Sequence, residues 1–271
     1  MVVSHEQQEF FARWGYLRFG SVYDDAELDR LRTSFADLRS AFDAAEPTDP
    51  LRRRAGAFNV TAGSGTTTPT LTKLFAVDDV FRAHAHHPVI AEVAATLLGT
   101  RQLRLMMDQV IEKEPGTSGF VHWHHDYASW QVQPAIQITC WLALDEVTAA
   151  SGAMHVVPGS HLLGEFARVD LGTGRKSSPV DRREVIPADP AAAGHEVVAL
   201  ELAPGECSFH HALTWHATPP NTVGGRRRAL VTRFMADGTR YRPMPGSKPA
   251  ATDGVDPMDN DEWYPIVWPV P

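Results

Sequence analysis

The pattern of apolar residues changes near residue 101 of this 271-residue chain, and that change restricts the fold more than any other feature. Upstream, four apolar residues fall three, four and three positions apart, the spacing of one helix face: Leu28, Leu31, Phe35 and Leu38. Downstream, short runs rich in β-branched and aromatic residues alternate with turns, as in 103–111, 136–144 and 229–234. Helices followed by many short strands predict an α+β fold, with a helical cover over a β core.

The same patterns predict the remaining elements. Ser4 is a candidate N-cap and Gln7 completes a capping box, so a helix is expected to begin there. The predicted helices are 4–13, 24–44 and a pair over 77–98 that is broken at Pro88. The other predicted strands are 16–19, 154–157, 196–202 and 207–210, and 45–70 is predicted to be a loop. Many short strands are typical of a double-stranded β-helix, the jelly-roll or cupin-like core, on one sheet of which we expect the N-terminal helices to pack.

We expect the whole chain, 1–271, to form a single domain. Its parts would be a mainly helical cover (1–100), a jelly-roll core (101–242) with an irregular insertion (162–195), and a tail (243–271). One domain of this length is ordinary for an all-β core.

Composition argues against several classes of partner. The net charge is −8 and there is no long basic run, so nucleic acid is not an expected partner. No apolar run approaches the roughly 20 residues that a membrane span needs, and the N-terminus lacks the pattern of a signal peptide. Both cysteines, Cys140 and Cys207, lie in apolar strand-like runs, which favours two buried thiols. We therefore expect a cytoplasmic protein with no membrane partner; no feature indicates an oligomeric state.

The segment 121–126, Val-His-Trp-His-His-Asp, offers potential metal ligands. In a regular strand alternate side chains share a face, so His124 and Asp126 would project together with His122. A third ligand must come from another strand, and His216 is the candidate. Two imidazoles and a carboxylate form the facial triad that holds non-haem Fe(II) and leaves positions open for oxygen and a co-substrate. Alone, a His-x-Asp pair is a weak signal. His122 and His124 also form a His-x-His pair, which suggests a cupin-type site, but no Glu follows at the short interval that such a site needs.

Downstream context makes the signal specific. Arg227 lies eleven residues after His216 and could pair with a dicarboxylate co-substrate through two parallel hydrogen bonds. With the His-x-Asp pair, further motifs occur in order: Trp141-x-Ala143-Leu144-Asp145, Ser151-Gly152 continuing to Pro158-Gly159-Ser160-His161, and His216-x-Thr218-x-x-Asn221. In these motifs the chain resembles the phytanoyl-CoA dioxygenase family of Fe(II)/2-oxoglutarate oxygenases. The resemblance covers most of the chain, but not the insertion or the tail.

The resemblance implies roles for individual residues. Iron would be bound by His124, Asp126 and His216. Arg227 would hold the distal carboxylate of 2-oxoglutarate, assisted by the hydroxyl of Thr218. The family places residues lining the co-substrate at positions matched by Gln109 and Trp141, and less closely by Lys73. Side chains near the ligand strand, namely His122, Tyr127 and Trp130, are candidates for substrate contact, although the two aromatics could equally be core residues.

The reaction implied is hydroxylation of a small molecule by O2, with decarboxylation of 2-oxoglutarate to succinate and CO2. Asp126 favours this outcome, because relatives that halogenate lack the carboxylate. Desaturation, epimerisation or cyclisation in specialised metabolism would use the same ligands. No feature demands a CoA thioester. Two other classes stay open: a non-catalytic jelly-roll binding protein, and a zinc hydrolase or isomerase, against which Arg227 argues.

Overall fold

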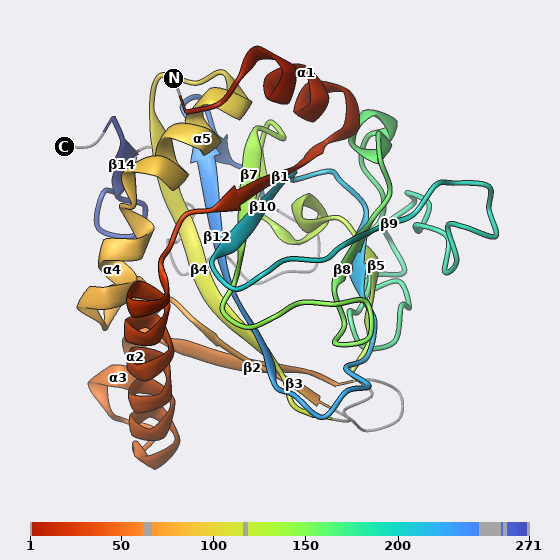
Figure 1. The fold of residues 1–271 in the computed structure, drawn as a ribbon. Coiled ribbons are helices and arrows are strands. Elements are labelled where there is room, and N and C mark those ends of the chain that lie inside the picture. Colours follow the sequence, from red (N-terminus) through yellow and green to blue (C-terminus); the bar gives the residue numbers. More distant parts are fainter. Residues whose placement is uncertain (1, 62–66, 116–118, 244–255, 257–258, 270–271) are drawn as a thin grey trace.

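The computed structural model describes residues 2–61, 67–115, 119–243, 256 and 259–269, and combines helices with two main β-sheets (Figure 1). The helices are α1 (His5–Trp14), α2 (Asp25–Ala44), α3 (Pro50–Arg54), α4 (Asp79–Ala85) and α5 (Pro88–Leu98), with short 3-10 turns η1 (Leu74–Ala76), η2 (Asp126–Ser129) and η3 (Ser160–Leu163). The prediction of a mixed helical and β fold is confirmed, and the sheets do not close into a barrel within the described residues.

The larger sheet has eight antiparallel strands. Its order is β1 (Tyr16–Ser21), β10 (Glu206–His211), β7 (Gln137–Ala143), β12 (Arg227–Ala236), β4 (Leu103–Lys113), β3 (Thr67–Thr72) and β2 (Gly56–Thr61), with β14 (Ile266–Trp268) also paired to β4. The smaller sheet has the order β5 (Val121–His124), β11 (His216–Thr218), β8 (Met154–Val156) and β9 (Val198–Leu200). A separate pair joins β13 (Arg240–Tyr241) to β6 (Val132–Gln133).

The helices begin where the sequence supplies caps. Ser4 accepts a hydrogen bond from the backbone of Gln7, whose side chain accepts one in return, as the capping-box pattern predicts. Asp24 and Glu27 form the same reciprocal pair at the start of α2. Local capping therefore fixes both helix starts before any tertiary contact forms.

The large sheet separates the main apolar core from a cavity that contains charged side chains. Leu230 and Phe234 of β12 join the main hydrophobic cluster, to which α2, α4 and α5 also contribute buried residues. Val231 and Arg233, between them in the sequence, face the opposite side. Figure 1 shows the helices on one side of this sheet and the small sheet on the other. The cavity lies between the two sheets, so strands β4, β7, β10 and β12 of the large sheet serve both the core and the cavity.

Two regions differ from the sequence-based predictions. The predicted loop over 45–70 contains α3 and the antiparallel hairpin of β2 and β3, whose pairing extends the large sheet from β4. Its Thr-rich sequence did not show strand alternation of apolar residues. In the predicted tail, β14 adds to the other end of β4, and Arg104 bonds Asp261 at 2.5 Å. No helix in the described part of the chain is both long enough and apolar enough to cross a membrane.

Candidate active site

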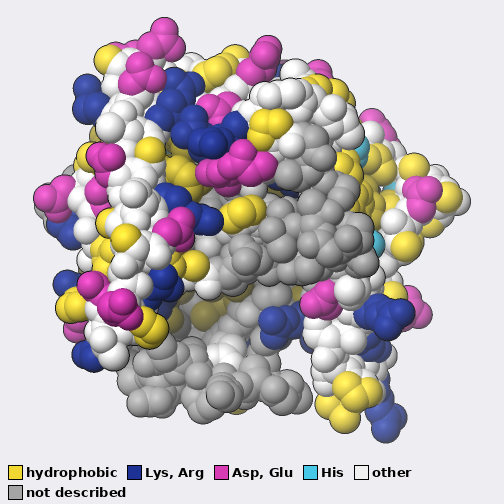
Figure 2. Space-filling model, turned by 90° about the horizontal axis from the view of Figure 1, so that it is seen from below, with side chains coloured by type: hydrophobic (Ala, Val, Ile, Leu, Met, Phe, Trp, Pro, Cys, Tyr) yellow, Lys and Arg dark blue, Asp and Glu magenta, His cyan; other side chains and the backbone are white. Residues whose placement is uncertain are grey.

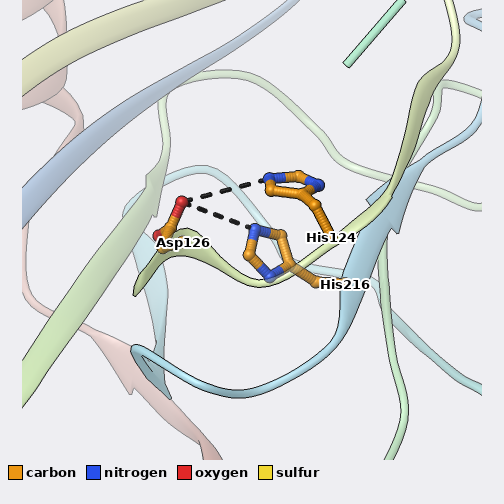
Figure 3. A group of neighbouring side chains, drawn as sticks. All are labelled: His124, Asp126 and His216. Carbon is orange, nitrogen blue, oxygen red and sulfur yellow. Dashed lines mark ion pairs between the residues drawn. The ribbon is translucent and has the colours of Figure 1, made fainter. Parts of the chain in front are cut away.

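The three predicted metal ligands meet at the junction of β5, η2 and β11. His124 is the last residue of β5 and lies opposite His216, the first residue of β11. Asp126 begins η2, two residues further along the chain. One ligand atom from each of the three residues lies within 4.8 Å of the others (Figure 3). The Asp126 Oδ1 atom is 4.0 Å from Nε2 of His124 and 3.9 Å from Nε2 of His216.

Backbone carbonyls set the orientation of both imidazoles. The Nδ1 atom of His124 is 2.7 Å from the carbonyl of His122, and Nδ1 of His216 is 2.9 Å from the carbonyl of Thr214. A carbonyl only accepts, so each Nδ1 carries the proton and each Nε2 presents a lone pair toward Asp126. Burial lowers the pKa of both imidazoles, that of His216 well below its ordinary value. Neutral imidazoles with free Nε2 atoms suit a divalent metal.

The second oxygen of Asp126 is held from behind. Thr139 donates its hydroxyl to Oδ2 at 3.0 Å, while Nε2 of His210 and Nε of Arg233 lie 3.5 and 3.6 Å away. Burial raises the pKa of the Asp126 carboxyl, but Arg233, His210 and His216 more than offset it and leave that pKa well below its ordinary value. The carboxylate is therefore ionised, with Oδ1 directed toward the two imidazoles.

The triad opens onto a cavity of about 400 Å³ between the sheets. Four residues predicted to contact the co-substrate also line it: Gln109, Trp141, Thr218 and Arg227. Arg227 is buried, with its Nη2 donating to the carbonyl of Gly152 at 2.9 Å and its Cζ 5.4 Å from the ring centroid of Trp141. Burial lowers the pKa of Arg227 to about 10, which leaves it charged at neutral pH.

Unpaired polar atoms test whether this end of the cavity fits a dicarboxylate. Nε and Nη1 of Arg227 and Oγ1 of Thr218 are buried and have no hydrogen-bond partner among the described residues. Buried polar groups are almost always paired, and an unpaired donor costs about 1–3 kcal/mol. A carboxylate beside Arg227 and Thr218 would satisfy these atoms, so the residues fit 2-oxoglutarate, as the triad fits iron.

Three predicted site residues lie elsewhere. His122 does not line the cavity; its ring contacts that of Phe120 at 4.9 Å. The segment at Gly174 packs against the His122 ring, since a Cβ on Gly174 would lie 2.8 Å from Nδ1 of His122. Tyr127 is buried with Trp130 but turns its ring to Arg242, and Lys73 stacks on Trp263 with its Nζ 4.2 Å from the ring centroid. Of the predicted substrate residues, Trp130 lines the cavity.

Several cavity residues were not predicted, among them Thr139, Arg168, His210 and Arg233. Arg233 lies six residues after Arg227 on the same strand, and an even spacing places both on one face. Strand alternation could therefore have identified Arg233. His210 gave no such signal, because its position depends on the pairing of β10 with β7.

Comparisons with known proteins agree with this geometry. The profile of the Phytanoyl-CoA dioxygenase (PhyH) family matches residues 11–229. A probable phytanoyl-CoA dioxygenase of Caenorhabditis elegans is 24% identical over 246 residues, covering 87% of this chain and 76% of that protein. Among solved structures, the non-heme alpha ketoglutarate dependent carbocyclase SnoK from nogalamycin biosynthesis has a TM-score of 0.76 at 22% identity, covering 97% of this chain and 96% of that one. The epimerase SnoN, in complex with Fe3+, alpha ketoglutarate and nogalamycin RO, has a TM-score of 0.74 at 24% identity, covering 97% of both.

Proposed function

The chain belongs to the phytanoyl-CoA dioxygenase family, and we propose that it hydroxylates a small-molecule substrate as a non-haem Fe(II)- and 2-oxoglutarate-dependent dioxygenase. It is an oxidoreductase, and its cofactors are iron, 2-oxoglutarate as co-substrate, and O2. One observation carries the proposed reaction: a triad of His124, Asp126 and His216 shares a cavity with the unpaired guanidinium atoms of Arg227.

The proposed roles follow from the positions of the side chains. His124, Asp126 and His216 would hold Fe(II) through two Nε2 atoms and Oδ1. Arg227 and Thr218 would hold the distal carboxylate of 2-oxoglutarate, because their free donors face the same cavity. Gln109 and Trp141 would line the co-substrate, and Trp130 the substrate. His122, Tyr127 and Lys73 take no part in this proposal, because none of them lines the cavity.

When bound, the iron and 2-oxoglutarate supply the oxidising chemistry, with decarboxylation to succinate and CO2. The protein's own residues orient and shield this chemistry. Thr139 and Arg233 hold Oδ2 of Asp126, which keeps Oδ1 directed at the ligand nitrogens. Trp141 and Trp130 wall the cavity with apolar surface and limit access of water to it.

A second candidate reaction is favoured by the solved structures. SnoK is named a carbocyclase and SnoN an epimerase, and each aligns with 97% of this chain. Cyclisation, epimerisation or desaturation would use the same triad and co-substrate. Product mass separates these outcomes: hydroxylation adds one oxygen atom, cyclisation or desaturation removes two hydrogens, and epimerisation leaves the mass unchanged.

We also propose that the whole chain forms one jelly-roll domain. The two facing sheets would be a jelly-roll core with the N-terminal helices packed on the larger sheet, and residues 1–271 would form one catalytic domain. The helical residues in the main hydrophobic cluster and the pairing of β14 with β4 support this unit, because the N- and C-terminal parts of the chain both attach to the large sheet.

The first experiment needs no substrate. Fe(II) and 2-oxoglutarate are added to the metal-free protein without oxygen, and the visible charge-transfer band of the chelated complex is recorded. We expect a band that requires both additions and that Zn(II) does not produce. Iron binding without a band would overturn the co-substrate assignment and favour the zinc-enzyme or binding-protein alternatives. Succinate release in a panel of small molecules, followed by product mass, then tests the reaction.

A further inference from the structure

The side chains that line the cavity carry an excess of positive charge. Among its Asp, Glu, Lys and Arg residues are one carboxylate, Asp126, and three guanidinium groups, Arg168, Arg227 and Arg233. The formal excess is therefore two positive charges, although the whole chain carries a net charge of −8. Fe(II) and the 2-oxoglutarate dianion cancel each other formally, so loading the site would leave this excess in place. A cavity of this sign favours an anionic ligand.

Arg233 is buried and has free donors. It is 8% exposed, and its Nε and Nη1 have no hydrogen-bond partner in the described structure. Its one ion-pair contact, to Oδ2 of Asp126, is 3.6 Å long, and its Cζ lies 5.8 Å from the ring centroid of Trp130. Burying an arginine with unpaired N–H groups is costly unless a ligand supplies the acceptors. Arg227 has its own candidate partner in the co-substrate, whereas the unbonded N–H groups of Arg233 face no described acceptor beyond the carboxylate of Asp126.

Arg168 enters the cavity from the irregular insertion. The turn formed by residues 168–177 closes with a bridge between Val169 and Lys176, and Asp170 caps it from within. Arg168 lines the cavity and is exposed, so it lies at the open end. No described carboxylate lies within ion-pair distance of it. Figure 2 shows the molecule hollowed in the middle of one face, with Lys and Arg side chains (dark blue) beside the hollow.

The 168–177 turn is attached to the strand that carries the first metal ligand. The backbone N–H of His122 donates to the carbonyl of Leu171 at 2.9 Å. Gly174 has a φ of +68°, and a Cβ there would lie 2.8 Å from Nδ1 of His122. Leu171 and Arg168 are thereby held in the cavity wall at a fixed offset from His124. This close fit also gives His122 a positioning role in place of the predicted one.

The rest of the wall around these arginines is apolar or neutral. Its apolar members include Val60, Met107, Ile111, Trp130 and Leu171. Such a surface suits a hydrophobic or aromatic ligand body, which the two cations would orient through a single anionic group.

We propose that the primary substrate is an apolar or aromatic molecule bearing a carboxylate, which Arg233 and Arg168 bind, and that the 168–177 turn is the element that selects it. This inference rests on the proposed function, since it names the substrate class of the same cavity. Arg233 supplies buried hydrogen bonds, and Arg168 adds a solvent-facing charge at the mouth. Screening by salt should therefore weaken the contribution of Arg168 more than that of Arg233.

The test compares acids with their neutral amides. Protein loaded with Fe(II) and saturating 2-oxoglutarate without oxygen is titrated with benzoate, naphthalene-2-carboxylate and octanoate, and with the three matching carboxamides. Calorimetry gives each Kd, and the charge-transfer band reports on the co-substrate. We expect at least one acid to bind about tenfold or more tightly than its amide, with the band retained. Arg168→Gln and Arg233→Gln should each reduce that preference several-fold.

Two variants serve as controls. Arg175→Gln removes an exposed arginine from the same turn and should leave the preference unchanged. Arg233→Lys keeps the charge and should retain part of the preference, which separates loss of charge from misfolding. Equal affinity for every acid and its amide, or no binding of any acid, would overturn the proposal. Loss of the band on adding an acid would place the anion at Arg227 and also overturn it. A missing band before any acid is added would instead count against the proposed function, and the charge preference can then be measured on the metal-free protein.

Discussion

Each side of the large sheet buries an aspartate, and the pKa values of the two carboxyls are shifted in opposite directions. Asp108 lies on the helical side with 0% exposure, and burial raises its pKa to about 7, although the backbone N–H groups of Phe75 and Leu74 oppose this. Asp126 lies on the cavity side with 6% exposure, and its pKa falls well below the ordinary value. Burial therefore favours the protonated form of a carboxyl in this fold, unless cations lie beside it.

The difference comes from what stands behind each carboxyl. Asp126 has Arg233, His210 and the hydroxyl of Thr139 around Oδ2. Asp108 accepts from the N–H of Phe75 at 2.8 Å through Oδ2, and its Oδ1 has no described partner. A carboxylate intended for a metal must stay ionised in a dry site, and nearby cations achieve this. The cations beside Asp126 thus distinguish its surroundings from those of Asp108.

The largest effect is expected from Asp126→Ala. Removing the anionic ligand should lower iron affinity by more than the roughly 100-fold typical of outer-shell changes, because a direct ligand is lost. Succinate formation from 2-oxoglutarate should disappear with it. Metal content after dialysis and succinate assays measure both. Asp237→Ala, an exposed carboxylate at the end of β12, is the control. Stoichiometric iron in Asp126→Ala would refute its assignment as a ligand.

Arg227→Gln should act on the co-substrate and spare the metal. A charge-assisted hydrogen bond contributes about 1.5–3 kcal/mol, so the Kd for 2-oxoglutarate should rise roughly 10- to 100-fold. Iron affinity should not change. Anaerobic titration of the visible band gives the Kd. The matched control is Arg228→Gln, since Arg228 is the next residue but pairs with Asp145 at 2.8 Å. Equal losses in both variants would mean that general charge, not a specific contact, binds 2-oxoglutarate.

Thr139→Val tests the support behind the ligand. The variant loses the hydrogen bond to Oδ2 but keeps Arg233 and His210, so iron affinity should fall by roughly tenfold. Thr232→Val is its counterpart on the helical side, where the hydroxyl bonds Nε2 of His84 at 2.8 Å. That control should lose stability and keep iron affinity. If Thr139→Val binds iron as tightly as the wild type, Arg233 alone orients the carboxylate.

Much of the fold and of the triad could be read from the sequence, because both depend on local spacing. The capping box at Ser4 and the apolar face from Leu28 to Leu38 are short-range patterns, and the structure has both. His124 and Asp126 are close in the chain, so their meeting needed little knowledge of the fold. The hairpin of β2 and β3 was missed, because the Thr-rich sequence of β3 lacks an apolar period.

The failures share one physical cause: they depend on long-range pairing. Lys73 lies at Trp263 because β14 docks on β4, some 160 residues away in the chain. His122 does not line the cavity, because the 168–177 turn packs on it. His210 reaches Asp126 only because β10 lies beside β7. None of these contacts has a local signature.

Asp108→Asn should have the smallest effect at the site and should leave iron affinity unchanged. It should instead change how the free energy of unfolding depends on pH. A folded-state pKa near 7, above the ordinary 3.8, means that the native protein holds this proton more tightly than the unfolded chain. The stability it contributes is present at low pH and is lost as pH rises through about 7, by up to about 1.4 kcal/mol per pH unit. Asn stays neutral and should remove this loss.

The measurement is urea unfolding of both proteins from about pH 4 to 8, read as the difference between the two free energies of unfolding. The difference is needed because His84, also on the helical side, has a pKa lowered to about 3 by burial. Its stability term rises with pH over much of the same range and would mask the wild-type slope. The free energy of unfolding of Asp108→Asn should increase relative to that of the wild type as pH rises toward 8. A difference that does not change with pH would mean that Asp108 is ionised in the fold, and that burial does not separate the two sides of the sheet.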